Sequence, residues 1–138
     1  DNAEHLYRYV RRFRPEVNAY FVLRRKSQDW PRLAADGFRL IPFGSADHEY
    51  ALLNARYLIS SHADRYIWDY LPAREYRDLL RFKFVFLQHG VISTDLASWL
   101  NTVPIDLMLT STEREYQSVV GSQNRYRLMP SQVALTGM

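Results

Sequence analysis

The sequence predicts an α/β fold in which a Rossmann-like parallel sheet carries helices on both faces. Short segments of β-forming apolar residues alternate along the chain with helical segments of about ten residues, the pattern of strand–helix–strand units. Residues 83–87 are almost entirely apolar, as in a strand that is buried on both faces of a parallel sheet. We expect residues 1–138 to form one domain.

Composition supports a globular protein and excludes several classes of site. The 138 residues are 47% hydrophobic and 14% aromatic, enough for a core of their own. No apolar run approaches the roughly 18 residues of a membrane-spanning helix, and residues 1–13 are too charged for a signal peptide. The absence of cysteine excludes disulfides, thiolate metal sites and cysteine nucleophiles, and fits a reducing compartment.

The first segment predicts an amphipathic helix that begins at Asp1 and ends before Pro15. Asp1 and Glu4 have the spacing of a capping box, with Asp in the usual Ser/Thr position. A helix with an apolar stripe needs a sheet to cover, so we expect the first strand of this sheet to lie upstream. The stripe consists of Leu6, Tyr9, Val10 and Phe13.

The next elements are delimited by proline, glycine and serine. A strand at 18–23 is followed by a helix at 29–35 with Pro31 in its first turn, and then by a strand at 38–43. Ser45 is placed to cap a helix at 46–54, and a strand follows at 57–60.

The second half continues the alternation after an irregular region. Residues 63–82 are aromatic and charged with Pro72 in the middle, and we expect a short helix at 74–80. The strand at 83–87 precedes a helix at 95–100 and a strand at 105–109. Thr112 and Glu115 form a second capping box for a helix that ends near Val120. A strand at 132–135 comes last.

Polar residues directly follow four of these strands. Because the carboxyl ends of parallel strands share one edge of a sheet, we expect the four segments to line one ligand cleft. The helix starts after Thr94 and Thr112 add backbone N–H groups and positive dipole ends, which favour phosphate. The four segments are Gly44-Ser45, Ser60-Ser61-His62, Gln88-His89-Gly90 and Thr110-Ser111-Thr112.

His89 is the candidate general base, because imidazole titrates near neutral pH and this one stands between a buried strand and a glycine. His62 is the second candidate; the alternative is a ring bonded only to backbone. His5 lies on a basic helix face, where it either holds a phosphate or is solvated. We expect His48, in mid-helix, to be structural or exposed. The four histidines are too scattered for a metal site, and no metal or other cofactor is expected.

The common sequence motifs of nucleotide binding and hydrolysis are absent. The chain has no P-loop, no GxGxxG and no GxSxG nucleophile elbow. Basic residues crowd its first quarter, although a solvated helix face is the simpler explanation of such a run. These residues are Arg8, Arg11, Arg12, Arg14, Arg24, Arg25 and Lys26, and the formal net charge of the chain is +3.

Six segments taken together resemble one protein family. They are DNAEHLYRYV, IPFGS, YLISSHAD, FVFLQHGVISTDLASWLN, IDLMLTSTEREY and VALTGM. In this order they are similar to the CDP-glycerol glycerophosphotransferases, which include the teichoic-acid polymerases and capsule-synthesis relatives of bacteria. The likeness covers essentially the whole chain, and its most specific part is FLQHGV with the DLASWLN and TST segments that follow.

The resemblance implies a function and a place in a larger protein. Residues 1–138 would be the N-terminal, acceptor-side domain of a two-domain GT-B fold, without its first strand. The other domain would bind most of the CDP-glycerol, or of a similar CDP-polyol. Glycerol phosphate would pass to a lipid-linked teichoic-acid or capsular polymer at the inner face of the bacterial membrane, where the basic first quarter meets anionic lipid. No nucleic-acid partner is expected.

The resemblance also implies which residues border the cleft. His89 or His62 would act as the base, and the opening from Asp1-Asn2 to His5 would lie nearby. With the residues that follow the strands, the candidate substrate- and phosphate-binding set is Asn2, His5, Ser61, Gln88, Gly90, Thr110, Ser111 and Thr112.

Two other functions fit the same pattern of elements. A GT-B glycosyltransferase that uses a nucleotide sugar would have the same sheet and cleft. A non-catalytic α/β module could bind nucleic acid or acidic lipid through the basic helix, but the aromatic residues are not interleaved with the basic ones as base-stacking platforms would be.

Overall fold

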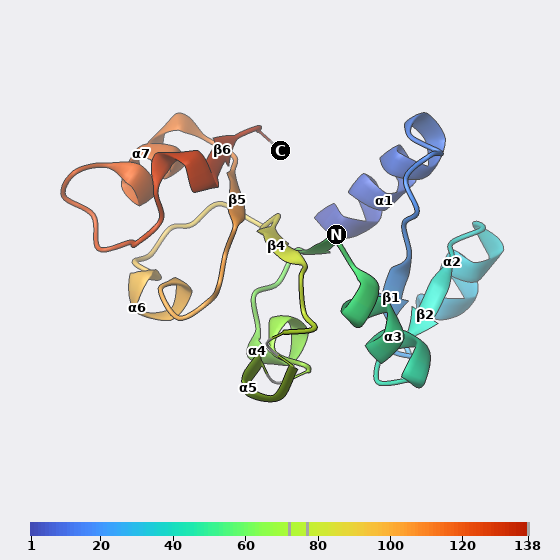
Figure 1. Ribbon diagram of the computed structural model, residues 1–138. Helices are drawn as coiled ribbons and strands as arrows, with labels where there is room; N and C mark the ends of the chain where they lie inside the picture. Colours follow the sequence, from blue (N-terminus) through green and yellow to red (C-terminus); the bar gives the residue numbers. More distant parts are fainter. Residues whose placement is uncertain (72, 77, 138) are drawn as a thin grey trace.

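The strands form two parallel sheets in the computed structural model, which describes residues 1–71, 73–76 and 78–137 (Figure 1). A two-stranded sheet pairs β1 with β2, and a four-stranded sheet has the order β3-β4-β5-β6. Every pairing is parallel, so the predicted α/β class is confirmed. The sequence predicted a single sheet, but no pairing among the described residues joins β1 to β3. The strands are β1 (Phe21–Leu23), β2 (Leu40–Pro42), β3 (Tyr57–Ser60), β4 (Lys83–Phe86), β5 (Leu107–Thr110) and β6 (Val133–Leu135).

The helices follow the predicted order; α3 has the predicted bounds, α7 ends at Val120 as predicted, and α2 and α6 begin later than predicted. The predicted helix at 74–80 corresponds to α5, whose described residues end at Tyr76, and the N–H groups of Leu79 and Leu80 both donate to the Tyr76 carbonyl. Pro72 and Arg77 lie outside the described residues. The sequence did not predict α4. The helices are α1 (Asn2–Phe13), α2 (Trp30–Ala35), α3 (Ala46–Asn54), α4 (Arg65–Trp68), α5 (Ala73–Tyr76), α6 (Ala97–Leu100), α7 (Glu113–Val120) and the 3₁₀ turn η1 (Pro130–Gln132).

The three predicted N-caps are confirmed. The side chains of Asp1, Ser45 and Thr112 each accept a hydrogen bond from the backbone N–H three residues later. The capping boxes are only half formed, because both acids have stronger partners elsewhere. Glu4 binds the guanidinium groups of Arg8 and Arg32, and Glu115 accepts from two backbone N–H groups outside its helix.

The main core lies on the four-stranded sheet. Phe84 and Phe86 from β4 and Met108 from β5 pack with Leu100 of α6 and Val119 of α7, and each is at most 4% exposed. This explains the almost entirely apolar composition of 83–87, since the central strands are covered by helices.

Helix α1 packs on the small sheet through a different face from the one predicted. Tyr7 is 6% exposed and its ring stacks on Phe38 and meets the edge of Phe21. Tyr9 and Phe13 contact each other and are more than half exposed, so the prediction was wrong for these two residues. The Tyr7 hydroxyl accepts a hydrogen bond from the Arg39 N–H, which fixes this face toward β2.

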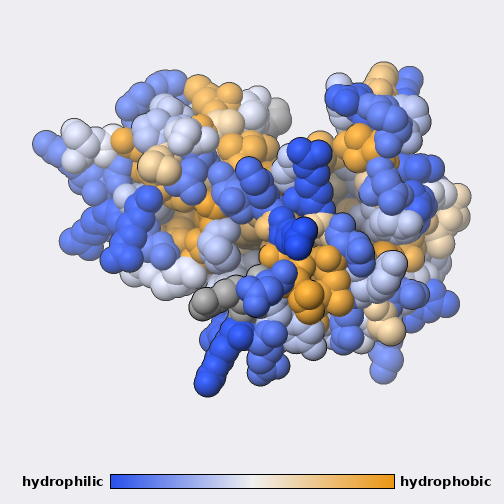
Figure 2. Space-filling view, viewed as in Figure 1, coloured by the Kyte–Doolittle hydropathy of each residue, from blue (hydrophilic) through white to orange (hydrophobic). Residues whose placement is uncertain are grey.

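The surface is hollowed between the lobe that carries α7 and β6 and the part that carries α1 (Figure 2). Apolar side chains reach the surface between these two parts. None of the helices described combines the length and the apolar character needed to cross a bilayer.

Candidate functional site at the carboxyl ends of the strands

His62 and His89 lie together where β3 and β4 end. Their ring centroids are 4.7 Å apart with an angle of 38° between the planes, and both side chains are exposed. Nδ1 of His89 is 3.0 Å from the carbonyl oxygen of Ser61. Because a carbonyl can only accept, the neutral His89 ring carries its proton on Nδ1, and Nε2 is the nitrogen left free to act as a base.

Gln88 directs His89 out of the sheet. It has a left-handed backbone with φ of 60°, which turns the chain sharply after β4. Its side chain is 5% exposed and donates from Nε2 to the carbonyl of Leu109 at 2.7 Å. Gln88 thus stays in the sheet while the next residue reaches solvent.

The first turn of α1 is attached to the same strand ends. Asn2 donates from Nδ2 to the Gln88 carbonyl at 2.9 Å, and the Ala3 N–H donates to Oγ of Ser61 at 3.0 Å. Ser61 is 1% exposed, so it serves as an internal connector. The N-terminal end of α1, which carries the positive end of the helix dipole, therefore lies beside the two histidines.

The end of β5 is joined to the segment after His89 by Glu115. The carboxylate accepts from the Ser111 N–H at 2.7 Å and from the Ile92 N–H at 2.8 Å, and the side chain is only 2% exposed. Sequence reasoning assigned Glu115 only to a capping box. The sequence did offer one signal for this role: Glu115 is an acid in the first turn of a helix that directly follows a buried strand.

Three further predicted residues lie at or after the ends of β4 and β5, and the two threonines among them form hydrogen bonds within the protein. Thr110 is 1% exposed and its hydroxyl donates to the Ala134 carbonyl. Thr112 uses its hydroxyl oxygen to cap α7, and its O–H remains able to donate outward. Gly90 is half-buried directly after His89.

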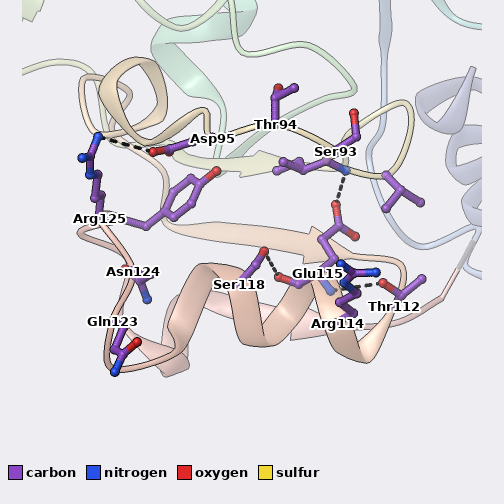
Figure 3. A pocket seen from close by; sticks show the side chains of 13 residues that line it. Ser93, Thr94, Asp95, Thr112, Arg114, Glu115, Ser118, Gln123, Asn124 and Arg125 are labelled. Carbon is purple, nitrogen blue, oxygen red and sulfur yellow. Dashed lines mark hydrogen bonds and ion pairs between the residues drawn. The ribbon is translucent and has the colours of Figure 1, made fainter.

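A cleft of about 650 Å³ opens beside these strand ends (Figure 3). One wall is formed by residues 91–95, and Asp95 belongs to it because α6 begins at Ala97 and not at the predicted position 95. Asp95 and Arg125 form an ion pair at 3.7 Å across one end, and Arg114 lies near the other. Most of the remaining lining is neutral and polar: Ser93, Thr94, Thr112, Ser118, Gln123 and Asn124.

The remaining two histidines have separate environments. His48 is 3% exposed, its Nδ1 accepts from the Gly44 N–H, and its ring packs on Phe43 and Tyr70, so it is structural. Burial lowers the pKa of His48. His5 is exposed on α1.

The fourth predicted strand end, Gly44-Ser45, is not bonded to the histidine pair within the described residues. The Gly44 N–H donates to His48 and Ser45 caps α3 instead. No group of three His, Asp or Glu side chains suited to a metal ion occurs in the part of the chain that the structure describes.

Comparison with known proteins bears out the resemblance. Residues 1–134 match the family model described as CDP-Glycerol:Poly(glycerophosphate) glycerophosphotransferase. The chain is similar to the Minor teichoic acid biosynthesis protein GgaB of Bacillus subtilis (strain 168), with 38% identity over 133 residues. That alignment covers 92% of this chain but only 14% of the relative. No solved structure matches the chain significantly. With nearly its whole length matched by the model, the chain belongs to the CDP-glycerol:poly(glycerophosphate) glycerophosphotransferase family.

Proposed function

We propose that the full-length protein transfers glycerol phosphate, or a related polyol phosphate, from a CDP-linked donor to a hydroxyl of a teichoic-acid or capsular polymer. Membership of the family supports the reaction class. The observation that carries the proposal for this domain is the exposed His89 ring, held through Nδ1 so that Nε2 points away from its anchor.

In this mechanism Nε2 of His89 takes the proton of the acceptor hydroxyl. The resulting oxygen attacks the β-phosphorus of the donor in line, a new O–P bond forms, and the bond to CMP breaks. CMP leaves with the electron pair of the broken bond. His62, whose ring is 4.7 Å from that of His89, is the second candidate for contact with the phosphate or the proton.

Substrate and phosphate contacts are proposed for the groups that surround this pair. Asn2, Ser61 and Gln88 hold the strand ends and α1 in place through their hydrogen bonds. The hydroxyl groups of Ser111 and Thr112 and the ring of His5 are the candidates for direct contact with phosphate. The buried Thr110 and the turn at Gly90 would shape the site.

The cleft beside the strand ends suits the acceptor. It begins at Val91, close to His89 in the chain, and its hydroxyl and amide groups can bond a polyol. The paired Asp95 and Arg125 leave little net charge at that end. We assign the acceptor polymer to this side and most of the donor to a second domain of a GT-B fold.

The basic face of α1 and the following segment fits a protein that works at an anionic membrane surface. Arg11, Arg12, Arg24 and Arg25 are exposed. At the inner face of the membrane these side chains would hold the enzyme near its lipid-linked acceptor. This placement makes the protein a peripheral membrane enzyme without a nucleic-acid partner.

The test is CMP release from CDP-glycerol by the full-length protein with substitutions at His89. His89→Ala should lower turnover at least about 10²-fold, the low end for loss of a general base. His89→Asn keeps an N–H near the position of Nδ1 but removes Nε2, so it should be as inactive as His89→Ala. His48→Asn is the matched control and should retain turnover. Near-normal turnover of the His89→Asn variant would show that His89 is not the general base.

The donor separates this function from its nearest alternative. If UDP or GDP is released from a nucleotide sugar and CMP is not released from CDP-glycerol, the protein is a glycosyltransferase. Tight binding of nucleic acid with a steep salt dependence would instead indicate a polyanion-binding module.

A further inference from the structure

Two arginines line the cleft, and they differ in their partners. Nη1 of Arg125 is 3.7 Å from the Asp95 carboxylate, so its charge is matched at that end. Arg114 lies at the opposite end, beside Thr112 and Glu115 (Figure 3). It is exposed, and the part of the chain that the structure describes offers it no ion pair. Its charge is therefore available to a ligand in the cleft.

The acids on either side of Arg114 are bound elsewhere. Glu113 accepts a hydrogen bond of 2.8 Å from Nε2 of Gln117. The carboxylate oxygens of Glu115 accept from two backbone N–H groups at 2.7 and 2.8 Å, and this side chain is only 2% exposed. The two acids thus use their oxygens within the fold, and among the residues described they leave the Arg114 guanidinium unmatched.

Arg114 occupies a position that costs the fold stability. It lies in the first turn of α7, directly after the N-cap Thr112 and Glu113. The partial positive charge at the N-terminus of a helix favours acids in this turn and repels cations. A cation without an ion pair at such a position breaks a local rule of helix stability, and departures of this kind are typical of functional sites.

The Arg114 end of the cleft is the end near the proposed base. Glu115, the next residue of α7, accepts from the N–H of Ile92, which is three residues after His89. The wall of the cleft begins at Val91. An anion held by Arg114 would therefore lie beside the segment that carries His89.

The chemistry of this end suits a phosphate group. A guanidinium can bind a phosphate through two parallel N–H bonds, and the hydroxyl of Thr112 can still donate to a phosphate oxygen. The rest of the cleft offers hydroxyl and amide groups and one paired charge, which suit an uncharged polyol. A cationic subsite next to a neutral one matches a polymer in which phosphodiesters alternate with polyol units.

We propose that Arg114 binds the phosphodiester that links the terminal unit of the acceptor polymer to the unit before it, and so selects a phosphate-linked acceptor over an uncharged one. This assignment rests on the proposed function, because it takes the cleft as the acceptor site. Arg114 holds the acceptor, while His89 takes the proton. Loss of Arg114 should therefore raise the KM for the acceptor and leave kcat nearly unchanged.

The test is CMP release from CDP-glycerol by the full-length protein with two synthetic acceptors. One consists of two glycerol units joined by a phosphodiester, and the other carries the same link as an uncharged methyl phosphotriester. Arg114→Gln should raise the KM for the charged acceptor about tenfold or more, as expected for loss of a charge-assisted hydrogen bond, with kcat within about twofold. The KM for the uncharged acceptor should not change.

Two further variants complete the kinetic test. Arg114→Lys keeps the charge and should recover part of the affinity. Arg127→Gln is the matched control, because Arg127 is exposed and lies outside the cleft lining; its KM values should equal those of the natural sequence. An unchanged KM in Arg114→Gln would overturn the proposal, as would equal losses for the two acceptors or a fall in kcat alone.

Urea denaturation separates a binding role from a structural one. Because the Arg114 charge opposes the helix dipole, the Arg114→Gln variant should have a urea midpoint equal to or above that of the natural sequence. A lower midpoint would show that Arg114 stabilises the fold, and would overturn the proposal.

Failure of the proposed function would give a different result, since the natural sequence would then release no CMP with either acceptor. In that case isothermal titration calorimetry with the phosphodiester-linked glycerol dimer, in the absence of donor, decides the proposal. Weaker binding by Arg114→Gln but not by Arg127→Gln supports it. Equal binding by the two variants, or no binding by the natural sequence, overturns it.

Discussion

Glu115 accepts a hydrogen bond of 2.8 Å from the backbone N–H of Ile92, although the two residues are 23 positions apart. The other carboxylate oxygen holds the Ser111 N–H. One buried side chain thus joins the segment that follows His89 to the segment that follows β5. Positioning of the proposed base therefore depends on Glu115, whose two carboxylate oxygens are both used within the fold.

Replacement of Glu115 by Gln should destabilise the protein by about 1–3 kcal/mol, the cost of leaving a buried polar group unsatisfied. The amide has one acceptor oxygen, so one of the two N–H groups would face an NH₂ donor. Urea denaturation measures the loss. Glu113→Gln in the same helical turn is the control, because Glu113 is exposed and bonds only the Gln117 side chain among the described contacts. Equal effects of the two substitutions would contradict the role of Glu115.

Gln88→Gly should be more stable than Gln88→Ala by about 1 kcal/mol, the reverse of the usual order. Both variants lose the hydrogen bond to Leu109, so their difference isolates the cost of a Cβ atom at φ of 60°. Thermal or urea unfolding of the two variants gives this difference. If the alanine variant is the more stable one, the left-handed turn is not required at this position.

The ion-pair cluster around Glu4 should stabilise the fold above acidic pH only. The hydrogen bond from Arg32, with a further one from Arg8, lowers the pKa of Glu4 from 4.5 to about 2. Since the folded-state pKa is depressed, this stabilisation is fully present above pH 4.5 and is lost as the pH falls toward 2.

Glu4→Gln should therefore cost about 1 kcal/mol near pH 7, because the arginine partners are 40% and 47% exposed and water screens the pairs. Near pH 2 the difference between the variant and the natural sequence should largely vanish. Urea denaturation midpoints of both proteins at several pH values measure this difference in stability. A constant difference across this range would show that packing, and not charge, accounts for the effect.

His48 should make the fold less stable as the pH falls below 6.5. Burial lowers the pKa of His48 from that value, so the unfolded chain takes up a proton before the folded one does. His48→Asn retains an acceptor for the Gly44 N–H and does not titrate. Between pH 7.5 and 5.5 the natural sequence should lose more stability than this variant. If the urea midpoints of the two proteins change equally with pH, the buried His48 ring does not account for the loss of stability.

Local signals in the sequence predicted the elements well. The caps at Asp1, Ser45 and Thr112 depend on residues three positions apart, so they are visible in the sequence. The apolar residues before Gln88 likewise predicted a buried strand that is followed directly by polar residues. The proximity of His62 to His89 followed from parallel pairing, which brings successive strand ends together.

Contacts between residues far apart in the chain could not be predicted from such local patterns. The apolar periodicity of α1 predicted a buried stripe that includes Tyr9 and Phe13, whereas it is the ring of Tyr7 that stacks on Phe38. Glu115 has its partners at the ends of two different strands, a relationship that no local pattern encodes. The cleft depends on where α6 begins, which is the least reliable feature of a prediction from propensity.

Gln88 is connected to three elements: its side chain donates to Leu109 of β5, its carbonyl accepts from Asn2 of α1, and its backbone follows the end of β4. Few amino acids combine a long amide with tolerance of a left-handed backbone. Natural variants of the family should accordingly show a narrower range of residues here than at the solvated His5, and loss of this residue should accompany changes in the neighbouring loops.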